Sequence, residues 1–370
     1  MPAGEAAGRA ALNNMAPMSL GRAPLALACL AVAAAMALAG CGGGSDSSSG
    51  SSAAAESRPA PPKSDFPSAE GKTLAEVAEA ADGPSELVVS PAAKVFYKGR
   101  NRYPFGVFER DRGQVPGAEV ALYFAHVPVP KGAAVGSKQA KEAQEEALDQ
   151  PAVGPFPAAI ESMETKPAFR ALTTTSDPDA ASAVYTAEID FPENGEWRIV
   201  ALIHEGDALK TSLLPSATVG TFTKIPRPGQ KAPLIHTPTP ADAGGDVSKI
   251  TTRVPPDTQH EVDYADALGR EPIVLLFATP QFCQSRVCGP VTDVAEQVKQ
   301  AYGDEAAFIH MEIYNDNDPS KGTRPQVRAF HLPSEPWLFA IDRRGRIESV
   351  IEGAFGVEKL TSVVEGLIGE

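Results

Sequence analysis

The hydrophobic pattern divides the chain into a region of short alternating runs and a later region of solid apolar runs. Between residues 85 and 225, short runs of aromatic and β-branched residues are separated by turn signals such as Asp111-Arg112-Gly113 and Glu193-Asn194-Gly195. This pattern is typical of antiparallel strands. It predicts strands at 102–110, 118–126, 183–191, 196–204 and 217–223. The charged, alanine-rich stretch 137–150 is better explained as a helical or loose insertion.

After residue 257 the period of the pattern changes. Residues 273–278 are an unbroken apolar run, which is typical of a strand covered on both faces. Pro290 suits the first position of a helix, and apolar residues follow it every three or four positions. The remaining pattern predicts helices at 260–268, 326–330 and 360–367, and strands at 307–314, 337–341 and 347–351. Helices and strands therefore mix, as in an α/β domain.

The stretch between these two regions, residues 226–256, is rich in proline. It contains seven prolines in 31 positions. Such a sequence is extended and stiff. We therefore expect a linker that marks the boundary between two domains.

The beginning of the chain has the pattern of an export signal. Arg22 precedes an apolar run at 23–39, which is shorter than the roughly 20 residues that a spanning helix needs. The run ends in Leu38-Ala39-Gly40-Cys41, which resembles the lipobox of bacterial lipoproteins. The resemblance implies a signal peptide at 1–40, cleavage before Cys41 and a lipid on its thiol. An ordinary signal peptide and an uncleaved anchor are the alternatives.

The resemblance to lipoproteins also implies a location and a tether. Residues 41–84 would form the lipidated cysteine and a flexible Gly/Ser/Pro tether, which places the protein on the extracytoplasmic side of the cell membrane. Residues 1–17 fit no part of a signal peptide. The sequence leaves open whether translation starts at Met1, Met15 or Met18.

The charge of the chain excludes several functions. The net charge is −14, and no run of lysine and arginine is present, so a nucleic-acid partner is not expected. The chain also lacks a glycine-rich phosphate loop, an H-E-x-x-H motif and a nucleophile elbow. We expect no cofactor.

The cysteines indicate where chemistry could occur. The chain has four cysteines, of which Cys29 lies in the expected signal peptide and Cys41 carries the expected lipid. Cys283 and Cys288 remain. Two thiols this close together in an exported protein are expected to form a disulfide.

Part of the first region resembles a known all-β family. The passage FERDRGQVPGAEVALYF, at 108–124, resembles a strand–turn–strand unit of bacterial immunoglobulin-like domains. The stretch Asn194-Gly195-Glu196-Trp197 is similar to a strand entry of these domains, in which the tryptophan packs between two sheets. The resemblance implies an immunoglobulin-like β-sandwich over residues 85–225.

The second region, residues 262–368, resembles thioredoxin. A strand at 273–277 leads into the cysteine-bearing loop, a helix opens at Cys288-Gly289-Pro290, and Glu335-Pro336-Trp337 precedes a later strand. The sequence pattern around this strand is most similar to that of membrane-anchored extracytoplasmic thioredoxins, such as those of cytochrome c maturation. The resemblance implies a thioredoxin-like domain at 257–370. It also implies a cis Pro336 that faces the disulfide, an attacking Cys283 and a resolving Cys288.

Two positions depart from the thioredoxin pattern. The cysteines are in a C-x4-C arrangement instead of W-C-x-x-C, and Leu276 stands where the family usually has a buried acid. In a continuous helix, residues five apart have Cα atoms about 8.6 Å apart, whereas a disulfide needs less than about 7 Å. Either residues 283–287 form a loop before a helix that begins near Gly289, or formation of the disulfide unwinds the first turn of a helix that contains both cysteines. Pro290 favours the loop.

The roles of the two cysteines remain open at this stage. A helix N-terminus and the nearby Arg286 both favour a thiolate, and both point more at Cys288 than at Cys283. For Pro336, the alternative is an ordinary proline at the entry of a strand.

Alternative functions are also open. The pair could be a structural staple, worth about 2–3 kcal/mol by loop closure. The stretch from Thr279 to Cys288 is similar to bacterioferritin-comigratory peroxiredoxins, but the spacing differs. Copper chaperones of cytochrome oxidase assembly share the fold and a close cysteine pair, and His331 is the weak candidate for their distal histidine.

The other histidines give no metal motif. His310 and Glu312 share one face of an expected strand, which more often marks a partly buried strand than a site. His126, His204, His236 and His260 are scattered.

Together these features predict a multidomain protein, with an all-β sandwich followed by an α/β thioredoxin-like fold. The favoured function is thiol–disulfide exchange with exported thiol or disulfide proteins. A non-catalytic surface binding module is the competing class.

Overall fold

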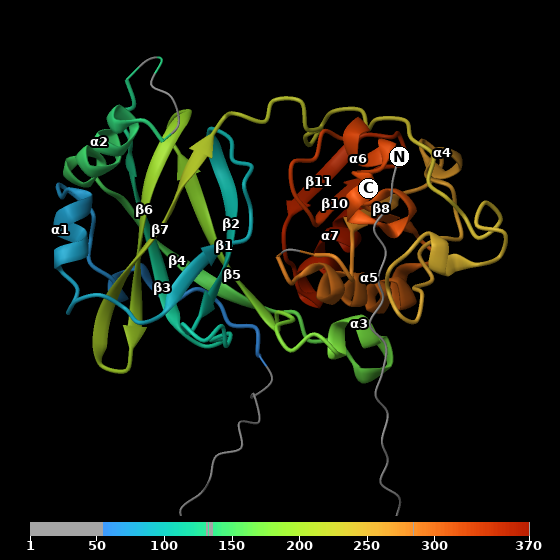
Figure 1. Ribbon diagram of the computed structural model, residues 1–370, viewed down its shortest axis with the longest axis horizontal. Helices are drawn as coiled ribbons and strands as arrows, with labels where there is room; N and C mark the ends of the chain where they lie inside the picture. The colour runs from blue at the N-terminus through green and yellow to red at the C-terminus, as the bar shows by residue number, and fades with distance from the viewer. Residues whose placement is uncertain (1–54, 131, 133–135, 284, 370) are drawn as a thin grey trace, which may run out of the picture. The chain divides into compact units, whose positions relative to one another are not determined.

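The computed structural model describes residues 55–130, 132, 136–283 and 285–369 (Figure 1). All of the described residues belong to one compact unit. The expected signal peptide, Cys29, Cys41 and the candidate start residues lie outside the described residues. Within the described part of the chain, no helix is both long and apolar enough to cross a membrane.

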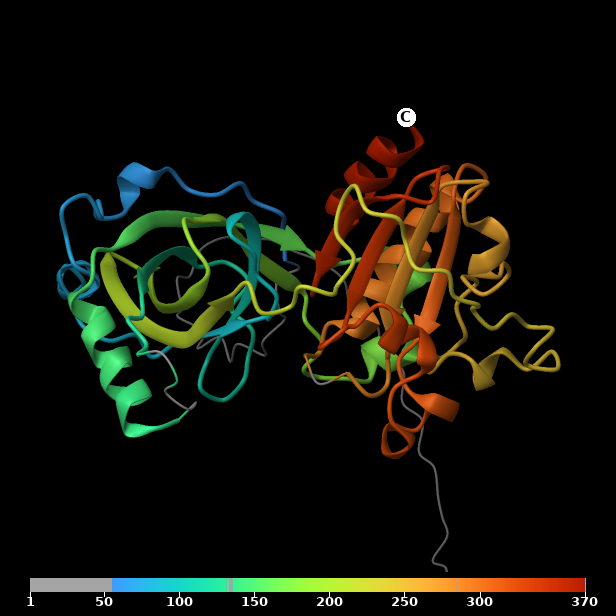
Figure 2. The same cartoon turned by 90° about the horizontal axis from the view of Figure 1, so that it is seen from above.

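The all-β domain is built from one seven-stranded sheet. Its strands are β1 (Val88–Pro91), β2 (Gly99–Phe108), β3 (Glu119–His126), β4 (Val153–Ser162), β5 (Ala183–Phe191), β6 (Gly195–Glu205) and β7 (Ala208–Val219). Their order is β1-β2-β5-β4-β3-β6-β7, and every neighbouring pair is antiparallel. Pro84, which precedes β1, and Phe96, which lies between β1 and β2, each form an isolated bridge to β7. These bridges bring the two ends of the sheet together and nearly close it. Figure 2 shows the strands curving around a common interior.

The all-β class is therefore confirmed, but the immunoglobulin-like sandwich is not. In a sandwich the strands form two separate sheets. Here β4 pairs with both β3 and β5, so the sheet is continuous and barrel-like. Trp197 is only 2% exposed and packs against Phe191, with ring centroids 5.6 Å apart. Its interior position agrees with the expectation, although the architecture around it differs.

Residues 55–84 correct the expectation of a flexible tether that extends to residue 84. They contain η1 (Lys63–Asp65) and α1 (Leu74–Glu79). The buried side chains of Phe66, Leu74 and Val77 pack against the outer face of the sheet. Thr73 and Glu76 form a capping box that begins α1. Few apolar residues occur in this segment, and they stand among polar residues and prolines. The sequence pattern therefore did not reveal that they anchor the segment to the sheet.

The insertion between β3 and β4 is helical, as expected. It forms α2 (Lys138–Glu146) and η2 (Ala147–Asp149). The Ser137 side chain accepts a hydrogen bond from the amide of Ala140 and caps α2. A second insertion, between β4 and β5, contains η3 (Pro167–Phe169) and α3 (Leu172–Thr175).

The second domain has the thioredoxin-like order of elements that the sequence predicted. It consists of α4 (Tyr264–Ala267), β8 (Ile273–Ala278), α5 (Cys288–Tyr302), β9 (Ala307–Glu312), η5 (Asn315–Asn317), η6 (Pro319–Lys321), α6 (Pro325–Ala329), β10 (Trp337–Ile341), β11 (Ile347–Glu352) and α7 (Val357–Ile368). The sheet order is β11-β10-β8-β9, with β8 parallel to β9 and the other two pairs antiparallel. Helices α5 and α7 pack on one face of this sheet, and α4 and α6 on the other. Both faces of β8 are covered, which explains its solid apolar run.

The proline-rich stretch 226–256 is not a free linker. Ile235 and Ile250 are buried, and Lys231 forms a bridge to Arg346. Residues 247–249 form η4 (Val247–Lys249). Prolines keep the segment extended, as expected, but an extended chain can lie along a domain when a few apolar side chains anchor it. The segment therefore belongs to the surface of the α/β domain.

Candidate functional site

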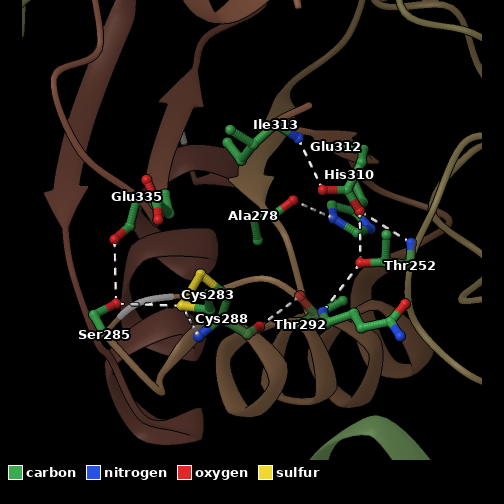
Figure 3. The surroundings of a disulfide bond; sticks show 11 residues. Thr252, Ala278, Cys283, Ser285, Cys288, Thr292, His310, Glu312, Ile313 and Glu335 are labelled. Carbon is green, nitrogen blue, oxygen red and sulfur yellow. Dashed lines mark hydrogen bonds between the residues drawn. A yellow bond between two sulfur atoms is a disulfide. The ribbon is translucent and has the colours of Figure 1, made fainter. Parts of the chain in front are cut away.

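Cys283 and Cys288 form a disulfide at the point where β8 leads into α5. Their Cα atoms are 5.7 Å apart (Figure 3). Helix α5 begins at Cys288, and the loop from β8 carries Cys283. The expected pairing is confirmed, and the described residues between the cysteines, 285–287, lie outside the helix, as expected.

The two sulfur atoms have different surroundings. Cys288 is wholly buried and packs with Val291 and Val294 of α5, whereas Cys283 is only half-buried. The amide N–H of Cys288 donates to Cys283 Sγ at 3.2 Å, and the Ser285 hydroxyl lies 3.3 Å from the same sulfur. The N-terminus of α5 is therefore directed at Cys283. The sequence pattern had pointed at Cys288, because it does not reveal which sulfur the amide faces.

Pro336 is placed beside this loop. The Glu335–Pro336 peptide bond is cis, and the buried Pro336 directly precedes β10. The Ser285 hydroxyl donates to the carbonyl oxygen of Glu335 at 3.3 Å, and Figure 3 shows Glu335 next to the disulfide loop. One serine therefore contacts both the half-buried sulfur and the proline segment. The expected docking role of Pro336 remains a prediction.

Arg286 forms an ion pair instead of standing free near the thiols. Its guanidinium lies 3.1 Å from a carboxylate oxygen of Asp179, and its backbone carbonyl accepts from the amide of Ala181. Arg286 also has a φ of 62°, which is unusual for a residue with a side chain. These contacts join the cysteine loop to the insertion that follows β4. The positive charge of Arg286 is thus balanced by Asp179.

Two cavities adjoin the cysteine loop. A small polar cavity of about 30 Å³ is lined by Cys283, Thr174 and Asp177, among others. A larger one, of about 350 Å³, is lined in part by Arg110, Arg112, Ser285 and Arg286. The larger cavity offers room for a side chain next to the loop.

Buried polar groups lie on the far side of the cysteine loop. Leu276 is wholly buried among apolar residues, so no acid occupies that position. Instead, the carboxylate of Glu312 accepts from the Thr252 amide at 3.0 Å and from its hydroxyl at 2.8 Å. Thr252 Oγ1 in turn accepts from the amide of Gln281, two residues before Cys283. Glu312 is therefore tied to the loop through Thr252 (Figure 3).

A second buried group joins residues that the sequence left scattered. Asp257, His260 and His310 come together between β9 and the segment that follows residue 250. His310 Nδ1 lies 3.0 Å from Asp257 Oδ2, and His310 Nε2 lies 3.1 Å from the carbonyl oxygen of Ala278. Burial raises the pKa of Asp257, but the charges of the two histidines and the hydrogen bond with His310 outweigh it and hold that pKa well below its usual range. The expectation that the histidines are scattered is wrong for this pair.

The only sequence signals for this cluster were weak. Asp257 and His260 are three residues apart in a proline-rich context, and His310 lies in a strand some 50 positions later. Polar residues at alternate positions of a strand that is buried on both faces were the one available indication. Nothing in the sequence showed which histidine would meet the strand.

His331, the weak candidate for a copper ligand, is exposed just after α6. Among the described residues, the one cluster able to hold a metal ion through three histidine, cysteine or acidic side chains contains neither cysteine. In this disulfide-bonded form, the described residues therefore do not bring a histidine and both cysteines together as a three-ligand cluster, and the copper-chaperone alternative stays a prediction.

Comparisons with known proteins give distant structural neighbours. A putative thiol:disulfide interchange protein DsbE from Chlorobium tepidum is 17% identical, with a TM-score of 0.28; the match covers 39% of this chain and 99% of that one. A thioredoxin-family thiol:disulfide interchange protein from the same organism has the same identity and TM-score, with 39% and 98% covered. A DUF4784 family protein from Bacteroides caccae is 14% identical, with a TM-score of 0.17 and 38% and 26% covered. No family profile and no curated protein matches this chain.

Proposed function

We propose that this protein is a membrane-tethered, extracytoplasmic thiol–disulfide oxidoreductase that acts on exported proteins through Cys283 and Cys288. One observation carries the proposal. The disulfide joins a half-buried sulfur, which faces the N-terminus of α5, to a wholly buried sulfur. A redox-active pair requires such asymmetry, because one sulfur must be attacked from outside and the other must leave and later return.

The exchange proceeds in two balanced steps. A client thiolate attacks Cys283 Sγ, a mixed disulfide forms, and the Cys283–Cys288 bond breaks to leave Cys288 as the thiolate. A second client thiolate then attacks the client sulfur of the mixed disulfide, which releases an oxidised client and leaves Cys283 as a thiolate. Two client thiols are thereby oxidised and the protein's disulfide is reduced. The reverse sequence reduces a client disulfide.

The chain offers each step a specific group. The amide of Cys288 donates to Cys283 and stabilises negative charge there, which is needed whenever this sulfur leaves or attacks. The Ser285 hydroxyl, 3.3 Å from the sulfur, can turn its one hydrogen from the Glu335 carbonyl oxygen to the thiolate. The segment at Glu335 and Pro336 lies beside the loop, where an extended client can dock. Arg286 holds the loop through Asp179. A lipid on Cys41 keeps the domain at the membrane, where exported clients emerge.

The experiment is a rate measurement with the chain from residue 42 onward, which contains only these two cysteines. The wild-type chain should catalyse reduction of a small disulfide-bonded protein substrate by dithiothreitol. Cys283→Ser should lower that rate to the uncatalysed background, because the attacking sulfur is missing. Equal rates for both proteins would overturn the proposal. They would indicate a structural disulfide in a non-catalytic binding module.

The tether is tested separately in cells. Cys41→Ala should move the protein from the membrane fraction into a soluble or differently processed form, because the lipid acceptor is gone. Membrane attachment unchanged by this substitution would contradict lipidation at Cys41.

A further inference from the structure

The buried cluster of Asp257, His260 and His310 has polar atoms that the fold does not satisfy. The three side chains are at most 4% exposed. His260 Nε2 lies 3.1 Å from Asp257 Oδ1, yet neither ring nitrogen of His260 has a hydrogen-bond partner among the described residues. The carboxylate oxygen is thus close to the ring but not in line with an N–H. Leaving such buried atoms unpaired is costly, and each case calls for an explanation.

The amide group of Gln259 shows the same deficiency. Its side chain is wholly buried, and both its oxygen and its nitrogen lack partners among the described residues. Gln259 immediately precedes His260. Two consecutive buried side chains without partners are difficult to reconcile with a site made only of hydrogen bonds.

We infer that Asp257, His260 and His310 form a buried binding site for one divalent transition-metal cation, with Zn²⁺ as the fitting ion. Imidazole nitrogen and carboxylate oxygen are the donors that zinc accepts. The three ligand atoms all lie within 4.8 Å of one another. Zinc–ligand bonds of about 2.0–2.1 Å at tetrahedral angles place neighbouring ligand atoms about 3.3 Å apart. Asp257 presents Oδ2 3.0 Å from His310 Nδ1 and its other oxygen, Oδ1, 3.1 Å from His260 Nε2, so each histidine approaches a different oxygen of the carboxylate.

The groups behind the ligands are also those of a metal site. The carbonyl oxygen of Ala278 lies 3.1 Å from His310 Nε2, which fixes a hydrogen on that nitrogen, while Nδ1 faces Asp257 and becomes the metal donor once the cation displaces its proton. The hydroxyl of Thr251 and the backbone N–H of Gln259 donate to the two oxygens of Asp257. Such outer contacts orient metal ligands and are typical of zinc sites. A water molecule can supply the fourth ligand.

The ion would hold the cysteine loop in place at its start, where the loop leaves β8. Ala278, which accepts from His310, is the last residue of β8, and the cysteine loop follows it. Asp257 and His260 lie in the segment that wraps the α/β domain. The cation would therefore clamp this segment to β9 and to the base of the loop, as a structural rather than a catalytic metal.

The test is a zinc-binding measurement on the chain from residue 42 onward, which retains every described residue and carries no histidine tag. After incubation with Zn²⁺ and removal of unbound ion by gel filtration, elemental analysis should find about one zinc per chain. His260→Gln should weaken zinc binding at least about tenfold in competition with a coloured chelator. His236→Gln is the matched control, because His236 is an exposed histidine that is also paired with an aspartate. It should bind zinc like the wild type.

Two further measurements keep the inference independent of folding defects and of the cysteines. Zn²⁺ should raise the melting temperature of the wild-type chain, because only the folded state holds the three ligands together. A Cys283→Ser, Cys288→Ser double variant should bind zinc equally well. A wild-type chain that retains no zinc and melts at the same temperature with and without it would overturn the inference. So would loss of the zinc in the cysteine double variant, which would place the ion at the cysteines.

Discussion

At the scale of single residues, the decisive feature is which sulfur receives the hydrogen bonds. Cys283 accepts from the amide of Cys288 and lies beside the Ser285 hydroxyl, whereas Cys288 is buried among apolar side chains. A charge-stabilised, accessible sulfur attacks and is attacked most readily. The account therefore assigns the exchange with clients to Cys283 and intramolecular resolution to Cys288.

This assignment predicts that Cys288→Ser traps clients. Without the resolving sulfur, a mixed disulfide between Cys283 and a client cannot be released internally. Non-reducing electrophoresis should show the complex, and a reductant should dissolve it. The matched Cys283→Ser variant should form none. A complex that forms through Cys288 in the Cys283→Ser protein would reverse the two roles.

Ser285→Ala should slow the reaction of reduced Cys283 with iodoacetamide at neutral pH. In the reduced protein the hydroxyl can turn its one hydrogen from the Glu335 carbonyl oxygen to the thiolate, and one such hydrogen bond contributes about 1 kcal/mol, or roughly a fivefold change. Alkylation followed by mass spectrometry measures the rate. Ser320→Ala, which alters an exposed turn serine, is the control and should leave the rate unchanged. Equal rates in both variants would show that Ser285 does not act on the sulfur.

At the scale of elements, the segment after residue 250 is the least expected part of the fold. Arg253 lies in this segment and pairs with Asp293 of α5 at 2.9 Å, with side chains 6% and 2% exposed. Arg253 also donates to the carbonyl oxygens of Phe169 and Pro255. The buried ion pair between Arg253 and Asp293 therefore fixes the segment to α5, and the segment is not a free linker between domains.

Arg253→Ala should destabilise the protein by about 3–5 kcal/mol, because it leaves Asp293 buried without its partner charge. Chemical denaturation measures the free energy of unfolding. Arg100→Ala is the control: Arg100 pairs with Glu188, and both side chains are mostly exposed, at 84% and 62%. It should cost no more than about 1 kcal/mol. A loss for Arg253→Ala as small as that of the control would contradict the anchoring role of this pair.

The sequence predicted the elements of the α/β domain well and those of the all-β domain less completely. Strands β8 and β10 have solid apolar runs, so their bounds follow from the pattern alone. Strand β4 was missed because Pro155 and Pro157 interrupt its pattern. Most of β7 was missed because its residues are half exposed and mixed in polarity.

The candidate site was predicted only in part, for a similar reason. The disulfide followed from the count and spacing of the cysteines. The continuity of the seven-stranded sheet depends on the pairing of β4 with both β3 and β5, and the histidine cluster depends on a segment that folds back over 50 positions. Local pattern carries no information on such long-range pairings.

At the scale of the whole molecule, a half-buried carboxylate joins the strand connection before β2 to β11. Glu352, in β11, accepts hydrogen bonds from the amides of Lys94 and Val95 and from the Ser334 hydroxyl. Burial raises the pKa of Glu352, and these hydrogen bonds offset only part of the effect. The ionised form is therefore destabilising in the folded protein relative to the unfolded one.

This shift predicts a pH-dependent effect of Glu352→Gln. A carboxyl whose pKa is raised on folding contributes most to stability when it is protonated, and that contribution is lost as the pH rises through its raised pKa. The glutamine variant does not ionise. Its stability relative to the wild type should therefore increase between pH 4 and pH 7, as measured by chemical denaturation. A difference that stays constant or decreases over this range would contradict the raised pKa.

The central claim is that the Cys283–Cys288 pair is redox-active, and its reduction potential tests this most directly. The chain from residue 42 onward can be equilibrated in dithiothreitol or glutathione buffers and read by thiol alkylation and mass. The account predicts a value between about −120 and −270 mV, the range of catalytic pairs. A value below about −300 mV would mark a structural disulfide and contradict the account.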